Sequence, residues 1–178
     1  MRLQNMLAVI AGAMGLALNP ASAQAQAQAQ PQVQQQVVAQ FDDSTISRLL
    51  LGVQANFNIE SGPNGGKVFR VTADGGVAFT VSPRSCSPET GCLSLLMVAV
   101  FTGNETSDVG KLDELLHRYN DLNPAGKVYR AGDGVVVLQD YLNAAYGISY
   151  GNAQTQLLVF GSEINKVRTE LSAFSQGR

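Results

Sequence analysis

The chain has 178 residues, of which 45% are hydrophobic and 15% are charged, a balance typical of a globular domain. Its 12 basic and 14 acidic side chains give a formal net charge of −2, and no basic run is present, which excludes the usual footprint of a nucleic-acid-binding protein. With one histidine and two cysteines, the chain lacks the four ligands of a structural zinc site, and we expect no metal and no cofactor.

The first residues follow the order of a secretory signal. Arg2 precedes an apolar stretch from Met6 to Leu18, and Ala21-Ser22-Ala23 supplies small residues for cleavage. The stretch is shorter than the roughly 20 apolar residues of a membrane-spanning helix. We therefore expect residues 1–23 to be a signal peptide and the mature protein to be periplasmic or secreted in a bacterium, without stable membrane insertion. The alternatives are a buried core helix or a membrane anchor.

Residues 24–40 are almost entirely Gln, Ala and Val, with one proline. Without charges or large side chains, this segment cannot bury enough surface to offset the entropy of ordering. We expect a disordered linker. The alternative is a Gln-rich segment that self-associates, which Pro31 and the alanines disfavour. A single folded domain is expected from residue 41 to 176.

The first half of this domain predicts one helix and three strands. After the capping residues Asp42-Asp43-Ser44, apolar residues continue at helical spacing as far as Phe57. Residues 67–72 and 77–81 are β-rich runs joined by an Asp-Gly turn, which indicates a hairpin. Residues 82–91 are expected to form a loop. The next run, Cys92 to Phe101, has no polar face, so we expect a central strand covered on both sides.

The second half predicts helix, two strands and helix. The first helix begins at Ser107 or Asp108, and a hairpin of residues 127–131 and 135–142 turns around Gly132-Asp133-Gly134. The last helix is expected from Asn152 to Phe174. The order α-β-β-β-α-β-β-α predicts an α+β fold with a mainly antiparallel five-stranded sheet and helices packed on one side.

Cys86 and Cys92 are the two cysteines of the chain. An even number of cysteines in an exported protein predicts a structural disulfide. The alternatives are metal ligation and a redox-active pair, but redox pairs usually have the spacing C-x-x-C.

No arrangement of nucleophile and base is evident, and we expect the protein not to be an enzyme. His117 stands alone, and the sequence has no G-x-S-x-G motif. A possible binding site lies where the second helix ends and the next strand begins, because Tyr119, Asn120, Tyr129 and Arg130 could gather at one edge of the sheet. The alternative is that both tyrosines fill the core while Asn120 caps the helix.

Apolar residues of the last helix recur at alternating steps of three and four, a spacing that lets helices pack together. Leu158, Phe160 and Phe174 include residues off the centre of this seam. Leu158 and Phe174 are therefore candidate contacts for a second copy in a homodimer or for another polypeptide. The alternative is that all of these residues belong to the core.

Four consecutive segments resemble the YbjN family. They are Leu116-His117-Arg118-Tyr119-Asn120, Val128-Tyr129-Arg130-Ala131, the turn Gly132-Asp133-Gly134, and the apolar strand from Val135 to Tyr141. The resemblance extends over about residues 44–174. It implies a fold similar to that of type III secretion chaperones and a role as a bacterial sensory transduction regulator.

We therefore expect a non-enzymatic periplasmic binding or regulatory protein that engages a polypeptide partner in a chaperone-like way. Such a protein should expose an apolar groove or sheet edge. The alternative is an envelope sensor for a small molecule, which should have an enclosed pocket near Tyr119, Tyr129 and Arg130.

Overall fold

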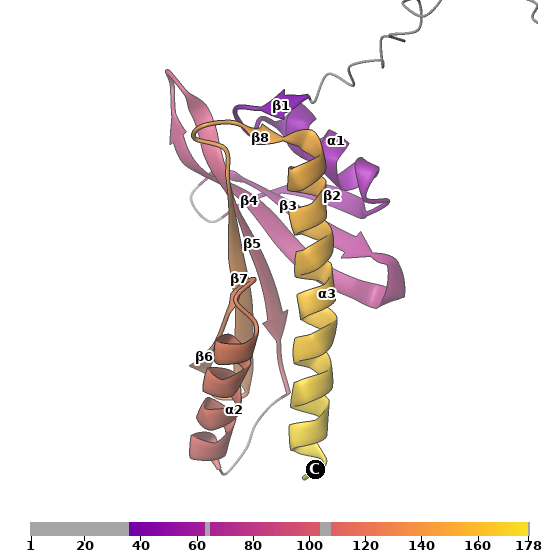
Figure 1. Ribbon diagram of the computed structural model, residues 1–178, viewed down its shortest axis with the longest axis vertical. Helices are drawn as coiled ribbons and strands as arrows, with labels where there is room; N and C mark the ends of the chain where they lie inside the picture. Colours follow the sequence, from indigo (N-terminus) through magenta and orange to yellow (C-terminus); the bar gives the residue numbers. More distant parts are fainter. Residues whose placement is uncertain (1–35, 63–64, 104–107, 178) are drawn as a thin grey trace, which may run out of the picture. The chain divides into compact units, whose positions relative to one another are not determined.

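The computed structural model describes residues 36–62, 65–103 and 108–177, so the signal-peptide prediction and most of the predicted linker lie outside the described residues. The helices are α1 (Asp43–Gly52), α2 (Val109–Leu122) and α3 (Tyr150–Ser175), with a short 3₁₀ turn, η1 (Asp74–Gly76) (Figure 1). The strands are β1 (Val37–Val38), β2 (Asn56–Ser61), β3 (Lys67–Ala73), β4 (Val77–Ser87), β5 (Gly91–Phe101), β6 (Lys127–Gly132), β7 (Val135–Asn143) and β8 (Ile148–Ser149). Within the described ranges, no helix is long and apolar enough to cross a membrane.

The main sheet is antiparallel throughout, with the strand order β2-β3-β4-β5-β7-β6. The predicted α+β class, antiparallel sheet and three helices are confirmed. The predicted count of five strands is wrong, because the main sheet has six, and β1 and β8 form a second, two-stranded sheet. The order of elements therefore also differs in detail from the prediction.

The missed strand is β2, which was assigned to the end of the first helix. The helix ends at Gly52, and Gln54 takes a left-handed backbone conformation with φ of 58°. This turn redirects the chain into β2. Phe57 then packs from a strand against Phe69, with ring centroids 5.8 Å apart. Its helical spacing from Leu50 and Val53 was therefore coincidental.

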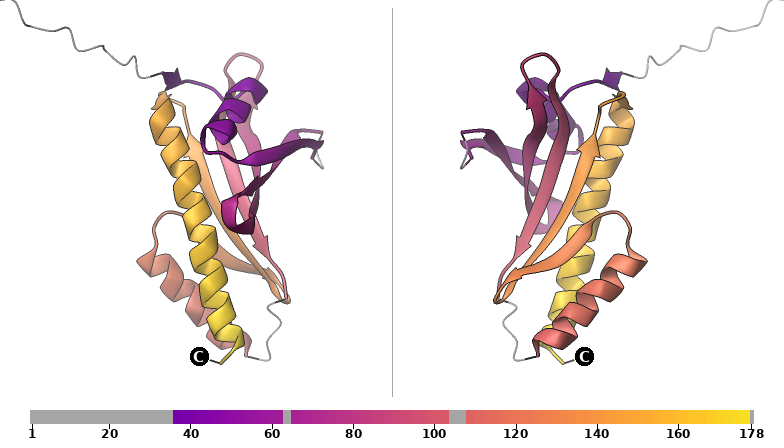
Figure 2. Two further views of the ribbon diagram at one scale, coloured as in Figure 1. Left: turned by 90° about the vertical axis from the view of Figure 1, so that its right-hand side faces the viewer. Right: turned by 90° about the vertical axis from the view of Figure 1, so that its left-hand side faces the viewer.

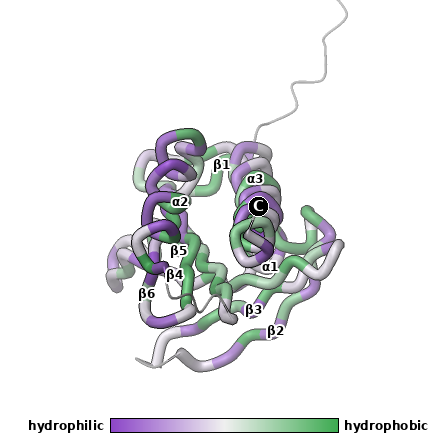
Figure 3. The backbone as a smooth tube through the Cα atoms, turned by 90° about the horizontal axis from the view of Figure 1, so that it is seen from below, coloured by the Kyte–Doolittle hydropathy of each residue, from purple (hydrophilic) through white to green (hydrophobic). Residues whose placement is uncertain are grey.

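The core lies between one side of the sheet and the helices. Figure 2 shows α2 and α3 on the same side of strands β4, β5 and β7, and Figure 3 shows the same arrangement from below. Side chains of β5 alternate accordingly, since Leu95, Met97 and Ala99 are buried while Val100 is 58% exposed. The expectation that this strand is covered on both sides is wrong, whereas helices on one side agree with the prediction.

Helix α3 spans the length of the sheet and supplies much of the core. It begins after Ser149, whose hydroxyl accepts a hydrogen bond from the N–H of Asn152. Phe160 is fully buried and packs edge-on against Phe79 of β4 at 5.5 Å. The buried positions are Ala153, Leu157, Phe160, Glu163, Ile164, Val167 and Leu171. The predicted amphipathic seam is therefore confirmed as a core-facing stripe.

Regular structure is present before residue 41, the predicted start of the folded domain. Val37 and Val38 pair with Ser149 and Ile148, and the carbonyl of Gln36 accepts a hydrogen bond of 2.7 Å from the N–H of Tyr150. The linker prediction is therefore wrong for residues 36–40. Composition averaged over a long Gln-rich segment conceals this two-residue strand, in which Val38 is only 4% exposed.

The region predicted as a loop, residues 82–91, mostly continues the β4–β5 hairpin. Cys86 and Cys92 occupy directly paired positions of the two strands and form a disulfide. Ser85 has a positive φ of 52°, and such a position, with Pro83 nearby, is typical of a turn rather than a strand. The predicted disulfide is therefore present, and it joins two strands of a hairpin instead of closing a loop.

Candidate functional site

Among the described residues, the helices lie on one side of the main sheet and none lies on the other, which we call the open face (Figure 2). Three large apolar or aromatic residues are exposed there, namely Val100 at 58%, Tyr141 at 53% and Tyr129 at 42%. They come from β5, β7 and β6. Their neighbours in the chain, Leu142 and Val128, point into the core and are almost fully buried, as the alternation of a strand requires.

The strand register brings these side chains together. Tyr129 lies opposite Val137, which in turn lies opposite Val100. Two residues further along β7, Gln139 pairs with Val98. Two residues beyond that, Tyr141 pairs with Leu96. Cross-strand partners on one face have Cβ atoms about 5 Å apart. These neighbouring side chains form the apolar strip, which consists of Leu96, Val98, Val100, Tyr129, Val137 and Tyr141. Val137 is only 7% exposed beneath its neighbours, and the amide of Gln139 lies among them.

The ends of the strip are charged, whereas its centre is not. A single cross-strand row runs from Lys127 through Gln139, Val98 and Thr80 to Arg70. Arg70 forms an ion pair with Glu60 at 2.5 Å. The strip is therefore an uncharged aromatic and aliphatic surface flanked by a lysine on β6 and a neutralised pair on β2 and β3.

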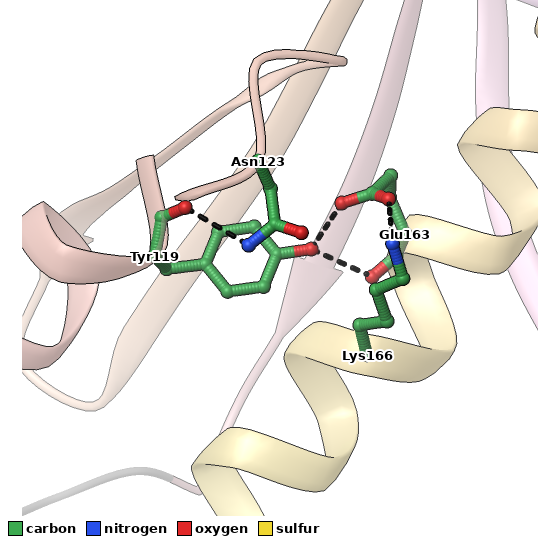
Figure 4. A network of polar contacts seen from close by, with 4 residues as sticks. All are labelled: Tyr119, Asn123, Glu163 and Lys166. Atoms are coloured by element: carbon green, nitrogen blue, oxygen red, sulfur yellow. Dashed lines mark hydrogen bonds and ion pairs between the residues drawn. The ribbon is translucent and has the colours of Figure 1, made fainter. Parts of the chain in front are cut away.

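Tyr119 is buried in the core. Its hydroxyl donates a hydrogen bond to the carboxylate of Glu163 on α3, and the ammonium of Lys166 lies 2.6 Å from the other carboxylate oxygen (Figure 4). Burial, followed by the adjacent carboxylate, raises the pKa of Tyr119. The phenol therefore stays protonated and joins α2 to α3.

Asn120 also has a structural partner, although not the one predicted. Its amide donates to the carbonyl of Val128 at 2.8 Å and accepts from the N–H of the same residue at 2.9 Å. The end of α2 is capped instead by Asn123, whose side chain donates to the carbonyl of Tyr119 at 3.0 Å. Asn120 thus occupies the outer edge of β6.

Arg130 and Tyr129, neighbours in sequence, serve different surfaces. The guanidinium of Arg130 makes two hydrogen bonds to Asp113 of α2, at 3.0 and 3.2 Å. This pairing holds the pKa of the Asp113 carboxyl below its usual range. Tyr129 projects from the open face instead. The four residues expected to gather at one edge are therefore separated. Tyr119 lies in the core, Asn120 bonds the edge of β6, Arg130 pairs with Asp113, and Tyr129 lies on the open face.

The two candidates on α3 are also in different surroundings. Leu158 is 58% exposed and lines a cavity formed with the end of α1 and the β3–β4 turn. Phe174 is half-buried and packs at the margin of the core, beside a hollow between α2 and α3. Phe160 is fully buried.

Val100 and Tyr141 of the apolar strip are not among the site residues predicted from the sequence. The signal for them in the sequence is the absence of a polar face from β5, a pattern that also fits a strand buried on both sides. Among residues 36–62, 65–103 and 108–177, no group of three or more His, Cys, Asp or Glu side chains could hold a metal ion.

The comparisons with known proteins identify the family. The family model YbjN, described as "Putative bacterial sensory transduction regulator", matches residues 54–173. A comparison with curated proteins gives no match. The matched segment runs from the turn after α1 to the end of α3 and covers well over half of the chain, which confirms the resemblance. The chain is therefore a member of the YbjN family.

Proposed function

We propose that this protein is a non-enzymatic regulator that binds a polypeptide partner through the apolar strip, in a chaperone-like way. The observation that carries the proposal is the mismatch between the sequence of β5 and its surroundings. The strand has no polar face, a pattern typical of strands covered on both sides. The helices cover one side, and Val100 remains 58% exposed on the other.

The chemistry of the strip suits a protein partner. Tyrosine is enriched at protein interfaces because it combines a large apolar surface with a hydroxyl. Tyr129 and Tyr141 flank the aliphatic centre formed by Val98 and Val100. Exposed apolar patches of this kind mark interaction sites in soluble proteins. A partner segment with apolar side chains and a polar or acidic group near Lys127 would complement the strip.

We also propose that the protein acts in the bacterial envelope. The order of charged, apolar and small residues in the first 23 positions supports export. The disulfide between Cys86 and Cys92 supports an oxidising compartment. N-terminal sequencing of the mature protein from a periplasmic extract tests this, with Gln24 expected as the first residue and the full-length chain in the cytoplasm contradicting it.

Site-specific photocrosslinking tests the binding face. A photoreactive phenylalanine analogue replaces Val100 at the centre of the strip, and in a control chain it replaces Thr72, which is exposed on the open face of β3. Irradiation in cells should give a covalent polypeptide adduct from position 100 well above that from position 72. Mass spectrometry then shows whether the adduct is a second copy or another protein. Equal yields at the two positions would contradict the proposal.

A further inference from the structure

We propose that α3 carries a second binding site, for a small apolar molecule with a positively charged or hydrogen-bond-donating head group. The site is a cavity of about 430 Å³ between the end of α1, the β3–β4 turn and the middle of α3. Ligand sites of small molecules commonly have volumes of roughly 300–1,000 Å³. The cavity is lined by none of the residues of the apolar strip, so the proposal is independent of polypeptide binding there.

The walls of the cavity are mainly apolar and rigidly held. Val77, Phe79 and Leu157 are at most 7% exposed and belong to the core. Leu158 lies at the rim, where 58% of its surface is exposed. Because these inner residues are packed in the core, the cavity exists without a ligand. A preformed cavity lowers the entropy cost of binding.

The polar groups favour one kind of ligand. Among the described residues that line the cavity, Asp74 is the one with a charge, and Gln54 and Asn165 contribute amides. A carboxylate attracts a protonated amine or a donor hydroxyl and repels an anion. The expected ligand is therefore an amphipathic amine or alcohol whose apolar part fits between Phe79 and Leu158.

One backbone feature at the cavity disfavours stability and suggests that the shape of the cavity has a role. Gly161 lies within α3, where glycine is a poor helix former, and an added Cβ there would meet nothing within 4 Å. Packing therefore does not require glycine, whose missing side chain leaves the cavity open. Gln54, in the turn that ends α1, also lines the cavity.

Three probes of similar shape test the proposal on the full mature protein: 2-phenylethylamine, 2-phenylethanol and 3-phenylpropanoate. Binding is followed by NMR chemical shifts of the amides around Val53, Val77 and Leu158. We expect saturable shifts, with the amine bound more tightly than the carboxylate by about tenfold, the size of one charge-assisted hydrogen bond. Equal affinity for amine and carboxylate, or no saturable shift, would overturn the proposal.

Variants locate the binding. Gly161→Leu should fill the cavity and remove the saturable shifts, while raising the melting temperature because the helix gains a better helix former. Gly151→Leu is the matched control, since a Cβ there also meets nothing within 4 Å and Gly151 does not line the cavity. Asp74→Asn should abolish the preference for the amine over the carboxylate. Unchanged amine binding by folded Gly161→Leu would place the site elsewhere and refute the proposal.

Discussion

Asn120 takes the place of a neighbouring strand at the outer edge of β6. Its carboxamide bonds both the N–H and the carbonyl of Val128, as a paired strand would. The unpaired backbone groups of an edge strand are a template for unwanted pairing. By occupying them at Val128, Asn120 attaches α2 to the sheet and blocks strand pairing at this position of the edge.

The Asn120→Ala variant should be destabilised by about 1–3 kcal/mol, because it leaves a partly buried N–H and carbonyl of Val128 unsatisfied. Asn120→Asp is the isosteric comparison. It keeps the acceptor for the Val128 N–H but places a charged oxygen against the Val128 carbonyl, so its loss at neutral pH should be at least as large. Urea unfolding measures both. Equal urea midpoints of unfolding for Asn120→Ala and the natural protein would show that the two hydrogen bonds between Asn120 and Val128 contribute nothing to stability.

Asp140 is a half-buried carboxylate in β7, and burial raises its pKa even though it accepts a hydrogen bond from the N–H of Tyr141 at 2.7 Å. A raised folded-state pKa means that the ionised group costs stability above that pKa and that the cost vanishes below the ordinary carboxyl pKa. Asp140→Asn should therefore stabilise the fold at neutral pH. The gain should disappear as the pH falls below about 4.

Unfolding of the natural protein and Asp140→Asn in urea at pH 7 and pH 3 measures this difference. Other titrating groups are shared by the two chains and cancel. A gain of equal size at both pH values would show that burial of charge is not its source.

At the scale of elements, the short strand β1 joins the start of the domain to α3. Val37 and Val38 pair with β8 directly before α3 begins, and the N–H of Phe41 donates to the carbonyl of Cys92 at 2.7 Å. Residues 36–41 thus connect the N-terminus of α3 to the disulfide-closed hairpin. This segment stabilises the part of the molecule farthest from α2.

Comparing Val38→Ala with Val37→Ala measures how much the buried side chain of β1 contributes to stability relative to the exposed one. Val38 is 4% exposed and Val37 is 63% exposed. At about 0.8 kcal/mol for each buried CH₂, Val38→Ala should lose about 1.5–2 kcal/mol and Val37→Ala little. Thermal and urea unfolding measure the two losses. Equal small losses would mean that residues before Phe41 do not contribute to the core.

The elements that could be predicted were those with strong local signals. Short-range residue spacing predicts the cap of α2 at Asp108, the hairpin around Gly132-Asp133-Gly134 and the apolar seam of α3. β2 was missed because Phe57 continues a helical spacing while the break lies in the backbone of Gln54. β1 and β8 were missed because two-residue strands have no periodicity and exist through mutual pairing.

At the scale of the whole molecule, the candidate site depends on how the layers are stacked. The sequence showed that β5 is apolar on both sides but could not show whether this chain covers both. Likewise, Tyr119 and Tyr129 lie ten positions apart, but Tyr119 points from α2 into the core whereas Tyr129 points from β6 onto the open face. The one-sided stacking leaves the apolar strip exposed on the described surface.

A charged substitution on the open face should have little effect on folding of the isolated protein but should weaken binding of a polypeptide partner. Val100→Asp replaces an exposed side chain, so it should change the free energy of unfolding by less than about 1 kcal/mol, within the range of strand preferences. Thr72→Asp on the same face is the matched control for that preference. In a complex, Val100→Asp would bury an unpaired charge, which is far more costly.

The most direct test measures the yield of polypeptide crosslinks from a photoreactive residue at Tyr141, in the natural background and in the Val100→Asp and Thr72→Asp backgrounds. Melting curves of the purified variants accompany it. The account predicts that Val100→Asp abolishes the crosslink while Thr72→Asp preserves it, with both variants folded. A full crosslink yield in folded Val100→Asp, or unfolding caused by this single change, would contradict the claim that the open face is a binding surface.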